Sequence, residues 1–240
     1  MKTRFIKFTF SLAAFGFVLQ AQGQGTFQNL DFESANLPYP NSPQPPTAVS
    51  FADAFPGWIG YAGINQLTTS FNNGVSGGSA LVTLITPNTV SLSLSNYVIS
   101  GHYTAVLATG VNGIDPVPPF ISAAIAQTGL IPLGTQSLRF SVGSLSAVSD
   151  LRLTLNGQNI PIFPLSAGSN YQVYGGDISA FAGLTEELRF TELAISFPFV
   201  FAYLDDIEFS SQAIPEPGVF GLFVFGALLL GWRLLRKRTL

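Results

Sequence analysis

Polar and apolar residues alternate with a period of two over much of the chain between residues 24 and 213. The alternation is clearest in "SLRFSV", where Leu138, Phe140 and Val142 share one face of an expected strand. Similar runs, bounded by Gly, Pro or Asn, predict strands at 79–86, 102–109, 120–128, 186–193 and 199–209. About ten such strands, with no amphipathic helix between them, predict an all-β domain of antiparallel sheets packed as a sandwich.

Shorter patterns refine this prediction. The stretch 151–163, "LRLTLNGQNIPIF", is expected to form a hairpin, because Asn-Gly is the favoured two-residue turn. "TFQNLDFE" at 26–33 is expected to be an early strand, although its apolar set changes face partway. "DISAFAGL" at 177–184 predicts a helical turn opened by an Asp or Ser cap. The five prolines of 35–51 predict a long surface loop.

The N-terminus interrupts the alternation with a continuous apolar run. Three cations fall in the first seven residues, an apolar stretch follows from Phe8 to Leu19, and small residues come next. This layout is typical of a secretory signal peptide, here residues 1–23 with cleavage near Gly23. An uncleaved anchor or a buried helix is the alternative, but the apolar core is shorter than the ~20 residues that span a bilayer.

The C-terminus carries a second apolar run. Residues 218–232 contain no charge, and with the following leucines the run predicts a transmembrane helix at 218–235. A buried helix of the sandwich is a poor alternative, because this segment is apolar around its whole circumference. The basic end should stay cytoplasmic and leave the preceding domain outside. It consists of Arg233, Arg236, Lys237 and Arg238.

Charge is distributed unevenly. Residues 24–213 contain three cations and twelve acids, a net charge of about −9. This negative charge argues against nucleic acid binding, which needs a cationic surface. The chain has no Cys, so disulfides and thiolate metal sites are excluded as well. Without disulfides, the hydrophobic core must hold the domain together, and a metal bound by oxygen ligands is a further source of stability.

The last 28 residues, 213–240, carry a specific pattern. Pro215, Glu216 and Pro217 precede the apolar segment, and the Arg-rich end follows it. The three parts in this order resemble the PEP-CTERM sorting tail of Gram-negative bacteria. The resemblance implies export across the inner membrane by the export machinery, transient membrane anchoring, and processing by an exosortase-type membrane protease. It further implies a final place on the cell surface or in the extracellular matrix of exopolysaccharide-producing, biofilm-forming bacteria.

A second resemblance covers the domain at 24–212. "NLDFE", "PGW", "DISAFAG" followed by "LRF", and "YLDDIEFS" occur in the order seen in galactose-binding-like jelly-roll domains, a fold that many secreted carbohydrate-binding modules share. The resemblance implies that the first and last strands lie side by side. Glu33, Asp205 and Asp206 would then converge on a structural Ca²⁺, which prefers oxygen ligands. The alternative is a set of solvated polar residues at strand ends.

Aromatic residues near the Pro-rich loop suggest a sugar site. Trp58 and Tyr61, with Tyr39 nearby, would form a platform for a sugar ring. The alternative is a buried Trp on a strand, "PGWIGY", whose Trp and Tyr point to different faces.

No catalytic pattern stands out. His102 is the only histidine, lies at the head of an expected strand and has no G-x-S-x-G partner motif. Glu186, Glu187 and Glu192 alternate between two faces of another strand without a distinctive spacing.

Together these observations predict an exported, non-enzymatic surface or matrix protein that is sorted through its C-terminal tail. The alternative is a carbohydrate-binding module that contacts extracellular polysaccharide. A hydrolase would need a cleft with paired carboxylates or an activated Ser near His102.

Overall fold

The structure, a computed structural model, describes residues 24–37, 47–72, 78–87, 97–111, 120–143, 150–195 and 199–214. Several predictions concern other residues. The signal peptide 1–23, Tyr39, the Pro-Glu-Pro motif 215–217, the apolar segment 218–235 and the basic end lie outside the described residues.

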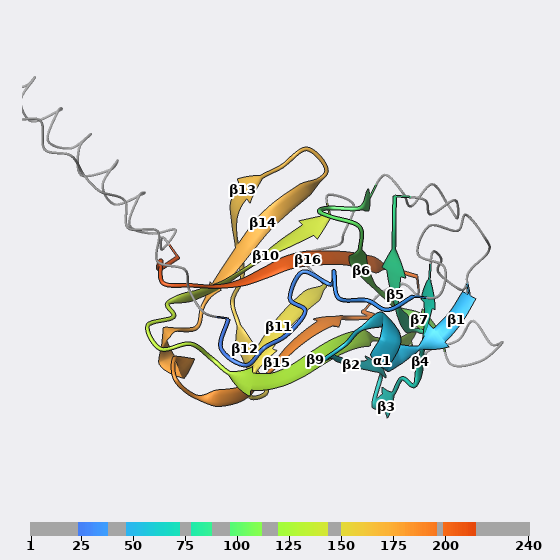
Figure 1. Ribbon diagram of the computed structural model, residues 1–240, viewed down its shortest axis with the longest axis horizontal. Coiled ribbons are helices and arrows are strands. Elements are labelled where there is room, and N and C mark those ends of the chain that lie inside the picture. The colour runs from blue at the N-terminus through green and yellow to red at the C-terminus, as the bar shows by residue number, and fades with distance from the viewer. Residues whose placement is uncertain are drawn as a thin grey trace, which may run out of the picture.

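Two large sheets form the body of the molecule (Figure 1). The larger sheet has, in spatial order, β1 (Thr47–Ser50), β4 (Thr69–Asn72), β5 (Leu81–Ile85), β6 (Thr104–Ala108), β16 (Phe201–Ser210), β10 (Ser137–Gly143), β14 (Tyr171–Asp177) and β13 (Phe163–Ala167). The smaller sheet has β12 (Gln158–Ile160), β11 (Leu151–Leu155), β15 (Thr185–Glu192), β9 (Ala123–Leu130), β2 (Ile59–Ala62) and β3 (Asn65–Gln66). A short third pair joins β7 (Gly110–Val111) and β8 (Phe120–Ile121).

The hydrophobic core fills the space between the two sheets. Leu138, Phe140 and Val142 of β10 are fully buried there, as their alternation predicted. Phe140 meets Phe190 of β15 edge-on, with ring centroids 4.9 Å apart, so an aromatic contact joins the two layers. The all-β sandwich is confirmed. Pairing is antiparallel except between β4 and β5, which run parallel.

Most expected strands are present. β5 and β6 fall within the predicted ranges, β9, β10, β15 and β16 extend one or two residues beyond theirs, and β11 and β12 form the predicted hairpin. Its turn residues Asn156 and Gly157 both have positive φ, 48° and 74°, as a two-residue turn of this type requires. The described residues contain more strands than expected, because several of them are only two to four residues long.

The predicted strand at 26–33 is wrong. Asn29 and Phe32 have φ of 51° and 58°, in the left-handed region that breaks a strand. The segment is instead a series of turns that places Phe27, Leu30 and Phe32 in the core. The change of apolar face within "TFQNLDFE" was the local sign of this break.

Short helical elements accompany the sheets. The helical turn expected in 177–184 is the 3-10 helix η2 (Ser179–Phe181). The predicted Asp or Ser cap is wrong, because the N-cap is Ile178, although the Asp177 carboxylate just before it accepts a hydrogen bond from the Ser179 backbone N–H at 2.9 Å. The predicted loop 35–51 is wrong at its end, where β1 forms. The helix α1 (Phe51–Ala54) follows directly and was not expected. Its one turn is anchored by the buried Phe51 and Ala54.

The larger sheet is buried on both faces at β5, β6 and β16. On its outer face Ile85, Val106 and Tyr203 form a second small core, against which Tyr97, Val98 and Ile99 pack. This cover explains why β5 and β6 are buried at every position rather than at alternate ones. The segment 97–103 begins in this cover and leads into β6. Its backbone N–H groups contact the carboxylates of the candidate site.

Candidate functional site

The early segment 27–34 lies along β16, the last strand. The Ile207 N–H donates a hydrogen bond to the Leu30 carbonyl at 3.0 Å, and the rings of Phe27 and Phe209 are 4.9 Å apart. The prediction that the first and last strands lie side by side is wrong as stated, because the segment beside β16 is not a strand and β1 lies at the edge of the larger sheet. The contact with β16 brings Asp31 and Glu33 toward Asp205 and Asp206.

Glu33 links the early segment to the residues before β6. Its Oε1 accepts hydrogen bonds from the backbone N–H groups of His102 and Tyr103 at 2.8 and 2.9 Å, and Oε2 lies 3.6 Å from His102 Nδ1. Gly101 makes this approach possible: its φ is +57°, and a Cβ there would overlap the Glu33 carboxylate. The His102 side chain itself is 78% exposed and lies at a bend before β6, so it is a surface histidine.

Asp205 is fully buried beneath the segment 97–103. Its Oδ2 accepts hydrogen bonds from Thr104 Oγ1 at 2.7 Å and from the Ser100 N–H at 3.3 Å. Its Oδ1 accepts one from the Asp206 N–H at 2.8 Å. Burial raises the pKa of Asp205 to about 8, against the opposing effect of the Thr104 hydrogen bond. The carboxyl thus acts as a buried anchor for the cover of the sheet.

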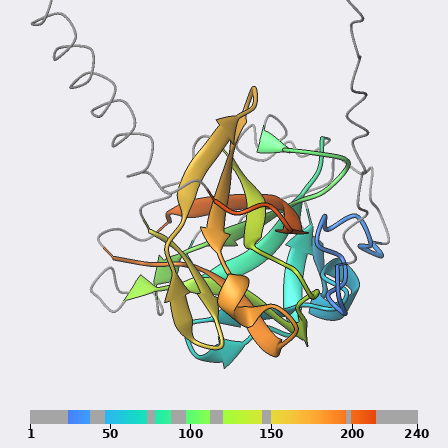
Figure 2. The same cartoon turned by 90° about the vertical axis from the view of Figure 1, so that its left-hand side faces the viewer.

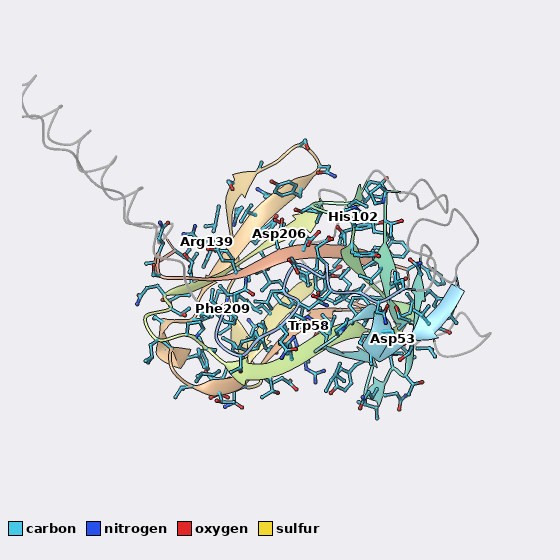
Figure 3. All side chains as sticks on the ribbon, in the orientation of Figure 1. Asp53, Trp58, His102, Arg139, Asp206 and Phe209 are labelled. Carbon is cyan, nitrogen blue, oxygen red and sulfur yellow. The ribbon has the colours of Figure 1, made fainter. Side chains whose placement is uncertain are left out.

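Asp206 differs from its neighbour because β16 is bulged here. The pairing of β10 with β16 shifts register between Arg139 and Ser141, and Asp206 has a φ of +47°. The bulge turns Asp206 to the surface while Asp205 stays inside. Burial raises the pKa of Asp206, and the negative charges of Asp31 and Glu33 raise it further. Figure 3 labels Asp206 and His102 above the core.

The convergence of carboxylates does not by itself give a metal site. Among the described residues no three Asp, Glu, His or Cys side chains form a group that could hold a metal ion. Glu33 Oε1 and both oxygens of Asp205 already accept N–H or O–H donors. These carboxylates serve here as hydrogen-bond acceptors, a role that fits a calcium ligand poorly, and the proposed Ca²⁺ at Glu33, Asp205 and Asp206 stays a prediction.

The predicted aromatic platform is wrong for Trp58. Its side chain is only 4% exposed, packs on Phe32 with ring centroids 5.8 Å apart, and donates a hydrogen bond from Nε1 to the Asn29 carbonyl at 2.9 Å. Figure 3 places the labelled Trp58 between the layers. Tyr61 is partly exposed, but the Arg189 guanidinium lies 4.2 Å from its ring centroid. The two aromatic side chains therefore form no shared surface.

The glutamates of β15 have separate environments. Glu187 is paired with Arg189, whose Nε donates to Oε1 at 2.9 Å. Glu192 is fully buried, and neither of its carboxyl oxygens has a hydrogen-bond partner. Burial raises the pKa of Glu192 to about 8, and the charge of Asp150 adds to the shift. No pair of these glutamates forms the open cleft of a glycoside hydrolase.

Sequence reasoning missed the burial of Glu192. The side chain shares a face of β15 with the buried Leu188 and Phe190, at the two-residue spacing that defines one side of a strand. That spacing was the available signal. The charge of Glu192 instead favoured a side chain exposed to solvent.

A cavity of about 550 Å³ lies at the β11–β12 edge of the smaller sheet. Arg152, Asn159 and several aliphatic side chains, including Ile162 and Ile195, line it. It contains no carboxylate and is separate from the Asp205 region. No helix among the described residues is long and apolar enough to cross a membrane.

Comparisons with known proteins add little to this geometry. The chain matches no protein-family model, and no curated protein is similar to it. One similar solved structure is the K1 cleaved adhesin domain of Lys-gingipain from Porphyromonas gingivalis W83. The identity is 12% and the TM-score 0.37, over 72% of this chain and the whole of that domain. A likeness at this level carries no argument about function.

Proposed function

We propose that this chain is an exported, non-enzymatic surface or extracellular-matrix protein that is sorted through its C-terminal tail. The observation that carries the proposal is the sequence of that tail: Pro215-Glu216-Pro217, a charge-free segment, and a basic end, in this order. At 1.5 Å per residue, the 18 residues of 218–235 would extend about 27 Å as a helix, close to the thickness of a bilayer core.

The end of the folded domain supports the proposal that the tail is a separate part of the chain. β16 ends at Ser210, and the residues after it are held to the body of the domain. Ser137 Oγ donates to the Gln212 carbonyl at 2.6 Å, and Arg139 donates to Gln212 Oε1 at 3.2 Å. The last strand thus ends before Pro215, and the core cluster of the described residues runs from Phe27 to Phe209. A protease that removes the tail would leave the folded domain unchanged.

The domain itself is proposed to be a jelly roll of the galactose-binding-like kind. The contact of segment 27–34 with β16 supports this, since both ends of such a domain lie together. The alternative function, carbohydrate binding through Trp58 and Tyr61, loses its basis because Trp58 is buried. A non-enzymatic role is supported by the environments of the β15 glutamates, one buried without a partner and one paired with Arg189.

Replacing Pro215, Glu216 and Pro217 by alanine tests the sorting role. In cells that contain an exosortase-type protease, we expect the unaltered protein to lose its tail and leave the membrane fraction. The triple variant should keep the full mass of its C-terminus and remain with the membrane. Intact-mass spectrometry of both fractions measures the outcome.

The matched control replaces Gly218 and Val219 by alanine, directly beside the motif, and should be processed normally. Equal processing of the triple variant and the unaltered protein would refute the proposal.

A further inference from the structure

Three leucines are exposed together at one end of the sandwich. Leu130, Leu133 and Leu184, here named the leucine tip, are 40%, 86% and 46% exposed. Leu130 ends β9, Leu184 precedes β15, and Leu133 lies in the turn between β9 and β10. Exposed apolar side chains are common singly, but a group of them marks an interaction surface.

The backbone brings the three leucines to neighbouring positions. The Ile131 N–H donates to the Leu184 carbonyl at 2.9 Å, and Leu130 lies opposite Thr185 in the ladder of β9 and β15. A Cβ on Gly183 would come 2.7 Å from Leu133 Cδ2, so Leu133 lies directly over the turn that carries Leu184. The neighbouring turns bring the leucines together.

The tip is held in place from within. Ile131 is fully buried, and the buried Thr135 donates from Oγ1 to the Pro132 carbonyl at 2.8 Å. The Gly183 N–H donates to the Ile131 carbonyl at 3.0 Å. Leu133 is therefore presented to solvent by an ordered turn, and its exposure is a property of the fold.

The tip lies at the end of the domain from which the chain leaves for its tail. The Gln136 N–H donates to the Ser210 carbonyl at 2.8 Å, and Ser137 holds Gln212. Figure 1 shows the β9–β10 turn and the end of β16 at its left-hand side, and Figure 2 faces that end, with the orange turn of η2 in front. Gly218, where the charge-free segment begins, is four residues beyond Ile214 and so within about 14 Å of it.

The residues between the leucines carry no charge, and the nearest acids, Asp177 and Glu186, lie on either side of the second turn. Neither "IPLGTQ" (131–136) nor "ISAFAGL" (178–184) includes an Asp, Glu, Lys or Arg. Contact through this surface would bury apolar side chains without the cost of removing a charge from water. Such a surface suits the boundary between the head groups and acyl chains of a lipid bilayer.

We propose that the leucine tip rests on the membrane from which the C-terminal segment emerges, with Leu133 as its deepest contact. The partner is the lipid surface, and the tip sets the orientation of the sandwich while the tail is in place. This inference rests on the proposed membrane anchoring of 218–235. It adds a second contact, which ends when the tail is cut and the domain leaves.

The absence of cysteine from the sequence permits a direct test with the full chain. Leu133→Cys is labelled with an environment-sensitive fluorophore and reconstituted in phosphatidylcholine vesicles that contain a brominated lipid quencher. The control is Ile64→Cys, in the turn between β2 and β3. Ile64 is 95% exposed, and the eight residues of β9, about 26 Å, separate it from the tip.

We expect the label at 133 to shift to the blue and to be quenched at least threefold more than the label at 64. The difference should persist in high salt, since no charge is involved. Adding Leu130→Asn and Leu184→Asn should reduce quenching at 133 at least twofold. Quenching of Trp232, in the tail, reports in the same sample whether the tail is inserted.

These readouts separate the two proposals. If Trp232 is quenched and the label at 133 remains in water, the tip proposal is wrong and the anchoring stands. If neither is quenched, both are wrong. If the label at 133 shifts only when the sorting protease is present, the surface binds that protein and the lipid proposal is overturned.

Discussion

Single carboxyl groups in this protein take their properties from where the backbone places them. Asp205 and Asp206 are adjacent, yet a bulge buries the first and exposes the second. Glu192 lies at the end of an inward-facing row and has no partner for either oxygen. A buried polar group without a hydrogen bond costs about 1–3 kcal/mol, so Glu192 is a point of local instability.

We expect Glu192→Leu to stabilise the domain, and by more as pH rises. The pKa of Glu192 is about 8 in the folded protein against 4.5 for an ordinary carboxyl. Between these values the folded state holds a proton that the unfolded chain releases, so stability falls with rising pH, by at most about 1.4 kcal/mol per unit. Replacing Glu192 removes this loss. Urea denaturation at pH 5 and pH 8.5 measures it.

Glu186→Leu is the matched control, because Glu186 lies on the same strand and is partly exposed. Asp205 keeps its own contribution to the pH dependence in every variant, so the difference between proteins is the relevant quantity. An equal change in the free energy of unfolding at both pH values, for Glu192→Leu, would contradict the burial of an ionisable group there.

At the scale of elements, the sequence predicted the hairpin turn but not the break in the expected strand at 26–33. The Asn156-Gly157 turn follows from two neighbouring residues, because few residue types accept positive φ. The prediction of a strand at 26–33 was wrong because it depended on backbone angles that neighbouring residues do not fix. Asn29 and Phe32 are held at positive φ by contacts with residues that are distant in sequence. Asn29 Nδ2 donates to the Pro56 carbonyl at 3.3 Å, and Phe32 packs on Phe55 and Trp58.

Gly157→Val tests the hairpin. The residue has a φ of +74° and no atom within 4 Å of an added Cβ, so the cost is conformational and not a clash. We expect a loss of roughly 1–2 kcal/mol in the free energy of unfolding, measured by urea denaturation. Asn156→Gly, which keeps positive φ accessible, is the control and should change stability little. A neutral Gly157→Val would show that the turn tolerates another backbone geometry.

At the scale of the whole molecule, Glu33 links segments that lie far apart in the sequence. It lies in the early segment that contacts the last strand, and it accepts two N–H groups from the residues before β6. The same region was predicted to bind calcium. Its hydrogen bonds indicate a different role, in which the carboxylate joins the early segment to the residues before β6.

We therefore expect Glu33→Ala to lower the free energy of unfolding by about 1–3 kcal/mol with or without a chelator. The loss comes from two backbone donors left without their acceptor. Thermal unfolding in EDTA and in CaCl₂ measures it. His102→Ala, which removes only an exposed partner of Glu33, should cost less than about 1 kcal/mol.

A melting temperature that rises with Ca²⁺ in the unaltered protein, and not in Glu33→Ala, would contradict this account. That result would restore the calcium hypothesis for Glu33, Asp205 and Asp206.

The sequence by itself determined the strands of the core and the hairpin turn. These follow from periodicity and from the few residues that accept special backbone angles, which are local properties. Only the tertiary structure decided that Trp58 is buried, that Asp205 and not Asp206 is enclosed, and that three leucines are exposed beside the exit of the chain. Each of these depends on which distant segment covers a face, and alternation along one strand does not contain that information.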